Sequence, residues 1–229
     1  MNHDADPRHL LVRALGEQSP LYVPETEIHP DVPDFTCNVR GDDPALGVPE
    51  DLVRSLASWA MSRPAAGFAS RPELRKHVKE GREKAQLLAA HLGPAWVVRY
   101  WDEQHESAKF VCWGCRRLHW TLGAHGDPPH PLHVIVQGEY RWYPLRAEGF
   151  EDFAPDDPAA ALGLSDSLVD DLYKWSADVD ANMDLYLQER EEDEREARKE
   201  ELERRGEALA ARVVQEVGPG RTVTYRGVW

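Results

Sequence analysis

The sequence predicts an α+β protein in which two helix–helix–strand units pack around antiparallel sheet, either one shared sheet or two separate lobes. A set of aspartate, apolar and glycine positions occurs twice along the chain, which indicates an internal repeat. Within each copy, leucine and tryptophan recur at the spacing of one helix face. The first copy contains Asp42-Asp43-Pro44, Leu46-Gly47, Leu52, Leu56, Trp59, Gly81, Gly93-Pro94, Val98 and Tyr100, and the second contains Asp156-Asp157-Pro158, Leu162-Gly163, Leu168, Leu172, Trp175, Gly206, Gly218-Pro219, Val223 and Tyr225.

The two copies differ in the length of chain between their helices. They are 116 residues apart at Trp59 and Trp175 but 125 apart at the two Gly-Pro pairs, so the second copy has gained nine residues. Paired copies favour a pseudo-twofold arrangement, like a homodimer joined into one chain. We therefore divide the chain into a proline-rich N-terminal segment (1–41), repeat one (42–103), a β-rich middle with a cysteine–histidine cluster (104–150) and repeat two (151–229).

Local signals place the individual elements. Pro49, followed by Glu50 and Asp51, suits the first turn of a helix, where negative charge is favourable. Ser165 is a good N-cap for the matching helix of the second copy. From these signals and from strand-like runs we expect helices at 9–15, 49–63, 72–92, from 165 onward and at 185–217, and strands at 21–23, 35–39, 96–102, 109–113, 133–137, 139–145 and 222–225.

Composition narrows the class of protein and of partner. The 229 residues are 41% hydrophobic and include eight tryptophans, which is enough apolar surface for a packed core. The formal charge of −14 and the lack of a basic stripe argue against nucleic acid as a partner. No segment has the roughly 20 apolar residues of a membrane span, and residues 1–13 do not resemble a secretory signal, so we expect a cytoplasmic protein with no membrane partner. The negative charge favours a basic protein partner, although it would also serve solubility alone.

Cys112, Cys115 and His119 are the residues most typical of a metal site. Thiolates two residues apart with an imidazole nearby are ligands of tetrahedral zinc, and Gly114 allows the backbone between them to turn. Cys37 is the candidate for a further ligand. The alternative is that these cysteines are small buried side chains on a hairpin and that no cofactor is bound. Further histidines follow at His125, His130 and His133.

Two further kinds of chemistry are less strongly indicated by the sequence, namely thiol redox chemistry and chemistry at paired carboxylates. The same Cys-x-x-Cys pair would serve thiol redox chemistry, but the residues after Cys115 do not predict the helix that lowers a thiol pKa in such sites. The two Asp-Asp-Pro runs would suit a divalent ion or acid–base work. Because aspartate before proline commonly begins a turn, and both runs precede a helix, we favour a structural role for them.

The aromatic residues fall into predicted core and predicted surface positions. Trp59 and Trp175 lie at matched places on apolar helix faces and are expected in the core. Strand side chains alternate between faces, so some aromatic residues should be exposed, where Trp and Tyr are common interface anchors. The candidate interface residues are Trp101, Trp142 and Tyr143.

Acidic and basic residues alternate over 188–205. This pattern predicts a solvated helix supported by the pairs Glu191–Arg195 and Glu194–Arg198, or else a projecting arm that contacts a partner.

The second copy resembles a class of small uncharacterised actinobacterial α+β proteins. That class implies a strand, a Leu-x-Leu-Ser helix that ends in Trp, a second helix with a glycine-containing stop, and a terminal strand. The likeness covers residues 140–229 best and 42–103 more loosely, and it implies no activity. It is carried by Leu162-Gly163-Leu164-Ser165, Leu168, Leu172, Trp175, Gly206, Gly218-Pro219, Val223 and Tyr225.

These observations together favour binding over catalysis. The sequence has no phosphate-binding loop, dinucleotide-binding motif, nucleophile elbow or His-Glu-x-x-His motif. We therefore predict a non-catalytic protein-interaction module, such as an inhibitor or immunity-type binder of a basic protein, for instance a nuclease toxin. The alternative is a zinc- or thiol-dependent enzyme or sensor that uses Cys112, Cys115 and His119. A third hypothesis is a metal-assisted hydrolase centred on Asp127 and the loop histidines.

Overall fold

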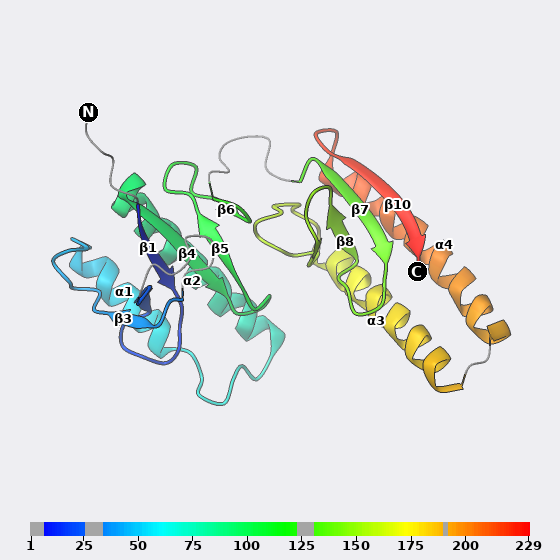
Figure 1. Cartoon of the computed structure of the whole chain (residues 1–229), viewed down its shortest axis with the longest axis horizontal. Coiled ribbons are helices and arrows are strands. Elements are labelled where there is room, and N and C mark those ends of the chain that lie inside the picture. The colour runs from blue at the N-terminus through cyan, green and yellow to red at the C-terminus, as the bar shows by residue number, and fades with distance from the viewer. Residues whose placement is uncertain (1–6, 26–33, 123–130, 190–191) are drawn as a thin grey trace. The chain divides into compact units, whose positions relative to one another are not determined.

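The computed structural model describes residues 7–25, 34–122, 131–189 and 192–229. It divides into two compact units, Met1–Gly126 and Asp127–Trp229. Each unit has its own β-sheet and its own pair of helices, which confirms the α+β class (Figure 1). The expectation of one shared sheet is wrong, because the described strands form two separate sheets.

The first unit contains a six-stranded sheet in the order β3-β2-β1-β4-β5-β6. The central strands β1 and β4 run parallel, and the other neighbours are antiparallel. Its elements are β1 (Arg8–Val12), β2 (Leu21–Val23), β3 (Cys37–Val39), α1 (Glu50–Met61), α2 (Arg71–Leu92), a 3-10 turn (Gly93–Ala95), β4 (Trp96–Asp102), β5 (Ser107–Val111) and β6 (Leu118–His119).

The second unit contains a four-stranded sheet in the order β10-β7-β8-β9. Here β7 and β10 are the parallel pair, and the remaining neighbours are antiparallel. Its elements are β7 (His133–Gly138), β8 (Leu145–Ala147), β9 (Asp152–Phe153), α3 (Asp166–Glu189), α4 (Glu192–Val217) and β10 (Thr222–Val228).

The two units have the same element order up to β4 in the first and β10 in the second. A first strand is followed by two antiparallel strands, then by a helix pair, and then by a strand that pairs in parallel with the first one. A parallel partner needs a long crossover, and the helix pair supplies it. Apart from this one parallel pair, the described strands of each sheet pair antiparallel, as the sequence predicts. The predicted helix–helix–strand repeat omits the strands that begin each unit. Descent from one ancestral unit and the pseudo-twofold relation stay predictions.

The surroundings of Trp59 and Trp175 are alike. The Trp59 indole Nε1 donates to the His77 carbonyl at 2.9 Å, and the Trp175 Nε1 donates to the Leu202 carbonyl at the same distance. Each indole is also near a tyrosine of the strand that follows the helix pair, with tilted rings whose centroids are 6.3 Å apart for Tyr100 and 6.4 Å for Tyr225. Both tryptophans are buried, so both are core residues as predicted.

Gly81 and Gly206 explain how the helices come so close to these rings. A Cβ on Gly81 would lie 2.2 Å from Trp59 Cζ2, and one on Gly206 would lie 2.6 Å from Trp175 Cζ2. Real atoms do not approach that closely, so only glycine leaves room for the indole against the second helix. The repeated glycines are thus packing positions.

Most of the predicted elements agree with the structure, and the exceptions have local causes. Residues 9–15 do not form a helix; Leu10, Leu11 and Val12 are buried in the central strand β1, and such unbroken apolar runs are typical of strands covered on both faces. Residues 139–144 form a turn in place of the expected strand, with Arg141 at φ +64°. Residues 185–189 belong to α3.

The nine additional residues of the second copy lengthen its helices. α1 has 12 residues and is followed by a loop, whereas its counterpart α3 has 24. The charged pairs expected at Glu191–Arg195 and Glu194–Arg198 involve side chains outside the described part of the structure. No helix among the described residues is long and apolar enough to cross a membrane.

The Asp-Asp-Pro runs form turns, in agreement with the structural role favoured above. Asp43 Oδ1 accepts from the Ala45 amide at 2.8 Å, and Asp157 Oδ1 accepts from the Ala159 amide at 2.8 Å. These are Asx turns that lead the chain toward the first helix of each unit.

Candidate functional site

The turn between β7 and β8, residues 139–144, presents the predicted interface residues of the second unit. Trp142 is 40% exposed and Tyr143 is 38% exposed, and Phe150, at 40%, follows shortly after β8. The Arg146 guanidinium lies 5.1 Å from the Trp142 ring centroid, and Tyr143 meets Tyr173 edge to face at 6.4 Å. Aromatic rings with an adjacent arginine are the composition found at the centre of protein interfaces.

Helix α3 and β9 hold this turn in place. Asp180 Oδ1 accepts from the Arg141 amide at 2.6 Å, and Asp184 Oδ1 accepts from the Tyr140 hydroxyl at 2.6 Å. The Asp152 carboxylate accepts from the Tyr143 amide at 2.6 Å. Because its backbone is fixed before any partner arrives, the turn loses little conformational entropy on binding.

The sequence analysis named Trp142 and Tyr143 as interface residues, which stays a prediction, and did not identify the residues that position them. Asp180 and Asp184 are four residues apart on one face of α3, and that spacing was the available signal. The hydrogen bond to Asp184 raises the pKa of Tyr140. The Tyr140 hydroxyl thus stays protonated at neutral pH and remains a donor.

The negative charge of the chain is concentrated in the second unit. Residues 127–229 hold 24 acidic and 12 basic residues, a formal charge of −12 out of −14. Residues 1–126 hold 17 acidic and 15 basic residues, so they are nearly neutral. Helix α3 alone carries seven acidic residues and one lysine. A long-range field that attracts cationic surfaces therefore comes from the second unit.

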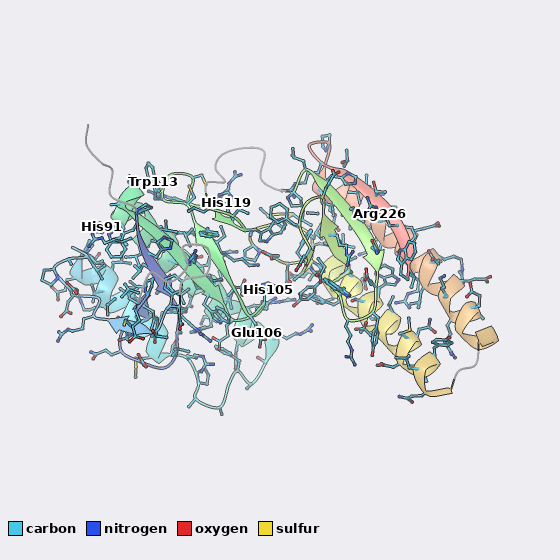
Figure 2. The ribbon with its side chains drawn as sticks, viewed as in Figure 1. His91, His105, Glu106, Trp113, His119 and Arg226 are labelled. Carbon is cyan, nitrogen blue, oxygen red and sulfur yellow. The ribbon has the colours of Figure 1, made fainter. Side chains whose placement is uncertain are left out.

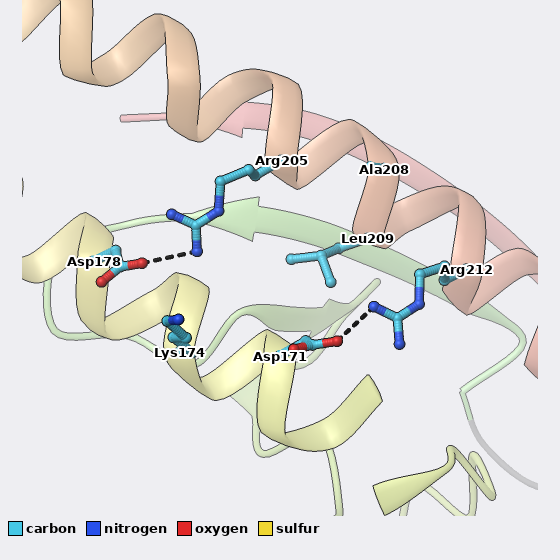
Figure 3. A pocket seen from close by; sticks show the side chains of 7 residues that line it. All are labelled: Asp171, Lys174, Asp178, Arg205, Ala208, Leu209 and Arg212. Atoms are coloured by element: carbon cyan, nitrogen blue, oxygen red, sulfur yellow. Dashed lines mark hydrogen bonds and ion pairs between the residues drawn. The ribbon is translucent and has the colours of Figure 1, made fainter. Parts of the chain in front are cut away.

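The groove between α3 and α4 uses part of this charge internally. Asp171 pairs with Arg212 at 2.6 Å, and Asp178 pairs with Arg205 at 2.8 Å, over a hollow of about 430 Å³ (Figure 3). Leu209 lies between the two ion pairs. Since these two carboxylates already face arginines, the groove is a weaker candidate for a cationic partner than the turn side of α3.

In the first unit, Cys112, Cys115 and His119 come together. Their ligand atoms all lie within 4.8 Å of one another, and Cys115 Sγ is 3.2 Å from His119 Nε2. The cysteines lie on the turn between β5 and β6, and His119 lies on β6 (Figure 2). This is a set of soft ligands of the kind that binds zinc.

Cys37 is not part of this cluster, which corrects the expected ligand set. It lies on β3, at the opposite edge of the sheet from β6, and β3 and β5 are four strand spacings apart, roughly 19 Å. His133 lies on β7 of the second unit, where its Nδ1 is 2.6 Å from Thr222 Oγ1. His125, His130 and Asp127, and with them the predicted hydrolase site, lie outside the described residues.

Trp101, the third predicted interface residue, is only partly exposed. The Arg13 guanidinium covers its ring at 4.2 Å from the centroid. This stacking gives Trp101 a partner within the first unit, so it offers less surface than Trp142. Its role as an interface anchor stays a prediction.

The second unit is a small α+β unit with a fixed aromatic turn and an acidic helix. In comparison with known proteins, residues 132–227 match the model of a family described as Serratia CdiI immunity protein-like. The matched region begins just before β7 and ends within β10, so it comprises almost the whole second unit and none of the first. No curated protein matches the chain.

Proposed function

We propose that this protein is an immunity-type binder that neutralises a basic protein toxin through its second unit. The observation that carries the proposal is that the matched residues 132–227 lie in the unit with a formal charge of −12 and contain the exposed aromatic turn. An immunity protein acts by binding, so it needs a complementary surface and no catalytic group. This accounts for the missing catalytic motifs.

The charge argues for a cationic partner. A concentrated negative field steers a basic protein to the surface and raises the association rate, while salt weakens the attraction. The turn side of α3 combines this field with Trp142 and Tyr143. We therefore place the contact with the toxin on the turn 139–144 and the neighbouring face of α3.

The aromatic turn supplies the short-range part of the affinity. Large aromatic residues in a fixed backbone bury much area at small entropic cost. Truncation of such an anchor typically costs 2 kcal/mol or more, which corresponds to a roughly 30-fold or larger loss of affinity. Trp142 is the residue we expect to act in this way.

A growth-protection assay tests the proposal. Cells that express a candidate basic protein toxin should survive when the full-length chain is co-expressed. The purified pair should form a complex whose association slows as salt rises. Trp142→Ala should weaken the complex by at least about 30-fold, whereas Trp229→Ala, a control at a 70% exposed tryptophan of the same unit, should not.

The proposal fails if the chain neither protects the cells nor binds the toxic protein at low salt. If Trp229→Ala weakens binding as much as Trp142→Ala does, the complex forms but the placement on the turn is wrong. These two outcomes separate the function from the surface that performs it.

A further inference from the structure

We propose that Cys112, Cys115 and His119 of the first unit bind one zinc ion. This site lies outside the residues that match the immunity family and goes beyond the function proposed above. The inference depends on the spacing of the ligand atoms, on the backbone that holds them, and on the hollow beside them.

The ligand atoms are already close to tetrahedral spacing. With the usual Zn–S and Zn–N bond lengths, ligand atoms of one tetrahedron are about 3.6–3.8 Å apart. Cys115 Sγ and His119 Nε2 are 3.2 Å apart, and all three ligand atoms fall within 4.8 Å of one another. Side-chain shifts of about an ångström would bring the three ligand atoms to three of the four positions of a zinc tetrahedron.

The sheet register brings His119 to the cysteine pair. β5 and β6 pair antiparallel, with Phe110 opposite His119. His119 therefore lies beside the end of β5, next to the residue where the cysteine turn begins. The turn itself is closed by two backbone hydrogen bonds, from Arg116 N to Cys112 O at 3.0 Å and from Cys112 N to Arg117 O at 2.9 Å. The site is therefore formed by the fold and does not require the metal to gather it.

Hydrogen bonds within the turn and from α2 also hold the cysteine pair in position. The Cys115 amide donates to Cys112 Sγ at 3.4 Å. Arg116 adopts φ +57°, a conformation unusual for a residue with a side chain. The Gln86 side chain from α2 fixes this residue by donating to the Arg116 carbonyl at 2.7 Å. A metal here would tie the turn to β6.

Two of the three ligand residues border a hollow with mostly apolar walls. Cys112 and His119 line a depression of about 590 Å³ together with Trp96, Phe110 and Trp113. Apolar walls limit access of water and strengthen bonds between a cation and thiolates. Two thiolates and one imidazole are soft and borderline ligands in a tetrahedral arrangement, which favours zinc over the hard ions calcium and magnesium.

Metal analysis of the full-length chain, purified without a histidine tag, tests this site. We expect one zinc ion per chain, and cobalt(II) added after zinc removal should give thiolate charge-transfer and tetrahedral d–d absorption. Cys112→Ser and His119→Gln should each abolish the zinc and the cobalt bands. Cys37→Ser is the matched control, because Cys37 is also a thiol of the same sheet but lies at its other edge.

Hydrogen exchange of the β4 and β10 peptides shows whether each variant remains folded, so a loss of metal can be separated from a loss of structure. The proposal is overturned if the folded wild-type chain takes up neither zinc nor cobalt. It is equally overturned if Cys112→Ser binds both ions as wild type does, or if Cys37→Ser loses them. None of these results bears on toxin binding, which is measured separately.

Discussion

The two units share a core but differ at their surfaces. In each, an indole donates to a carbonyl of the second helix, lies against a glycine of that helix and is near a tyrosine of the strand after the helix pair. Yet residues 1–126 have a formal charge of −2 and residues 127–229 one of −12. Close packing restricts core positions strongly, whereas surface positions tolerate change. The residues that occur in both copies are therefore packing positions, and functional residues are expected at the surface positions where the two units differ.

Each unit also carries its own addition to the common core. The first continues into β5 and β6, where the thiol–imidazole cluster lies. The second has longer helices and the aromatic turn. The proposed zinc site and the proposed toxin-binding surface both lie in these additions.

The largest effect is expected from Gly81→Ala and Gly206→Ala. Alanine is the better helix former by about 1 kcal/mol, so replacement of an ordinary mid-helix glycine should stabilise. Here the added Cβ would lie 2.2 Å and 2.6 Å from buried indole carbons, and overpacking of this kind typically costs about 1–3 kcal/mol. The cost of the clash should exceed the gain in helix propensity, so each variant should lower the free energy of unfolding of its own unit.

Hydrogen exchange of the full-length chain, followed in peptides from β4 and β10, measures the two units separately. Gly220→Ala is the control, since a Cβ there would meet no atom within 4 Å, and its effect should stay within about 0.5 kcal/mol. If Gly81→Ala and Gly206→Ala are as mild as the control, the close glycine–indole contact is not a shared requirement of the two cores.

A smaller, pH-dependent effect is expected at His77, where the cores differ. The second unit has Leu202 at the matching place, because both residues supply the carbonyl that accepts from the indole. His77 stacks on Trp59 at 5.0 Å, and its buried Nε2 has no hydrogen-bond partner. Burial lowers the pKa of His77 below its usual value of 6.5.

The sign follows from proton binding. With the folded-state pKa lowered, the unfolded chain binds more protons between the two pKa values, so stability of the first unit should fall as pH falls below about 6.5 and level off below the folded pKa. The slope should not exceed about 1.4 kcal/mol per pH unit for one group. His77→Leu should flatten the profile measured by denaturant unfolding. An unchanged profile would show that other groups cause the acid sensitivity.

Sequence reasoning identified the elements that have strong local signals. The strand 96–102 and the helix of residues 71–92 follow from apolar pattern, proline and glycine. It failed for β1, where three adjacent apolar residues fit a helix as well as a buried strand, and for residues 139–144, where aromatic residues with high strand propensity form a turn. The parallel pairing of β1 with β4 and of β7 with β10 joins residues about 90 positions apart, which no local signal reveals.

The candidate sites were predictable to a similar extent. Cys112, Cys115 and His119 are near in sequence, and the structure brings them together. Cys37 does not belong to the predicted ligand set, because sequence spacing does not show which strand lies at which edge of a sheet. The support of Trp142 and Tyr143 by Asp180 and Asp184 was missed, since it joins a turn to a helix about 40 residues away.

The smallest effect is expected from Asp178→Asn, which removes the Arg205–Asp178 pair across α3 and α4. The two side chains are 36% and 40% exposed, and ion pairs of this kind contribute about 0.2–1 kcal/mol and are screened by salt. A double-mutant cycle with Arg205→Gln, measured by denaturant unfolding at low and high salt, should give a coupling in that range that shrinks as salt rises. The apolar contacts around Trp175 and Leu209 would then hold the helices together in the second unit, as Trp59 does in the first. A coupling above about 2 kcal/mol that resists salt would instead show that ion pairs hold α3 and α4 together. The two cores would then be alike only in their tryptophan contacts.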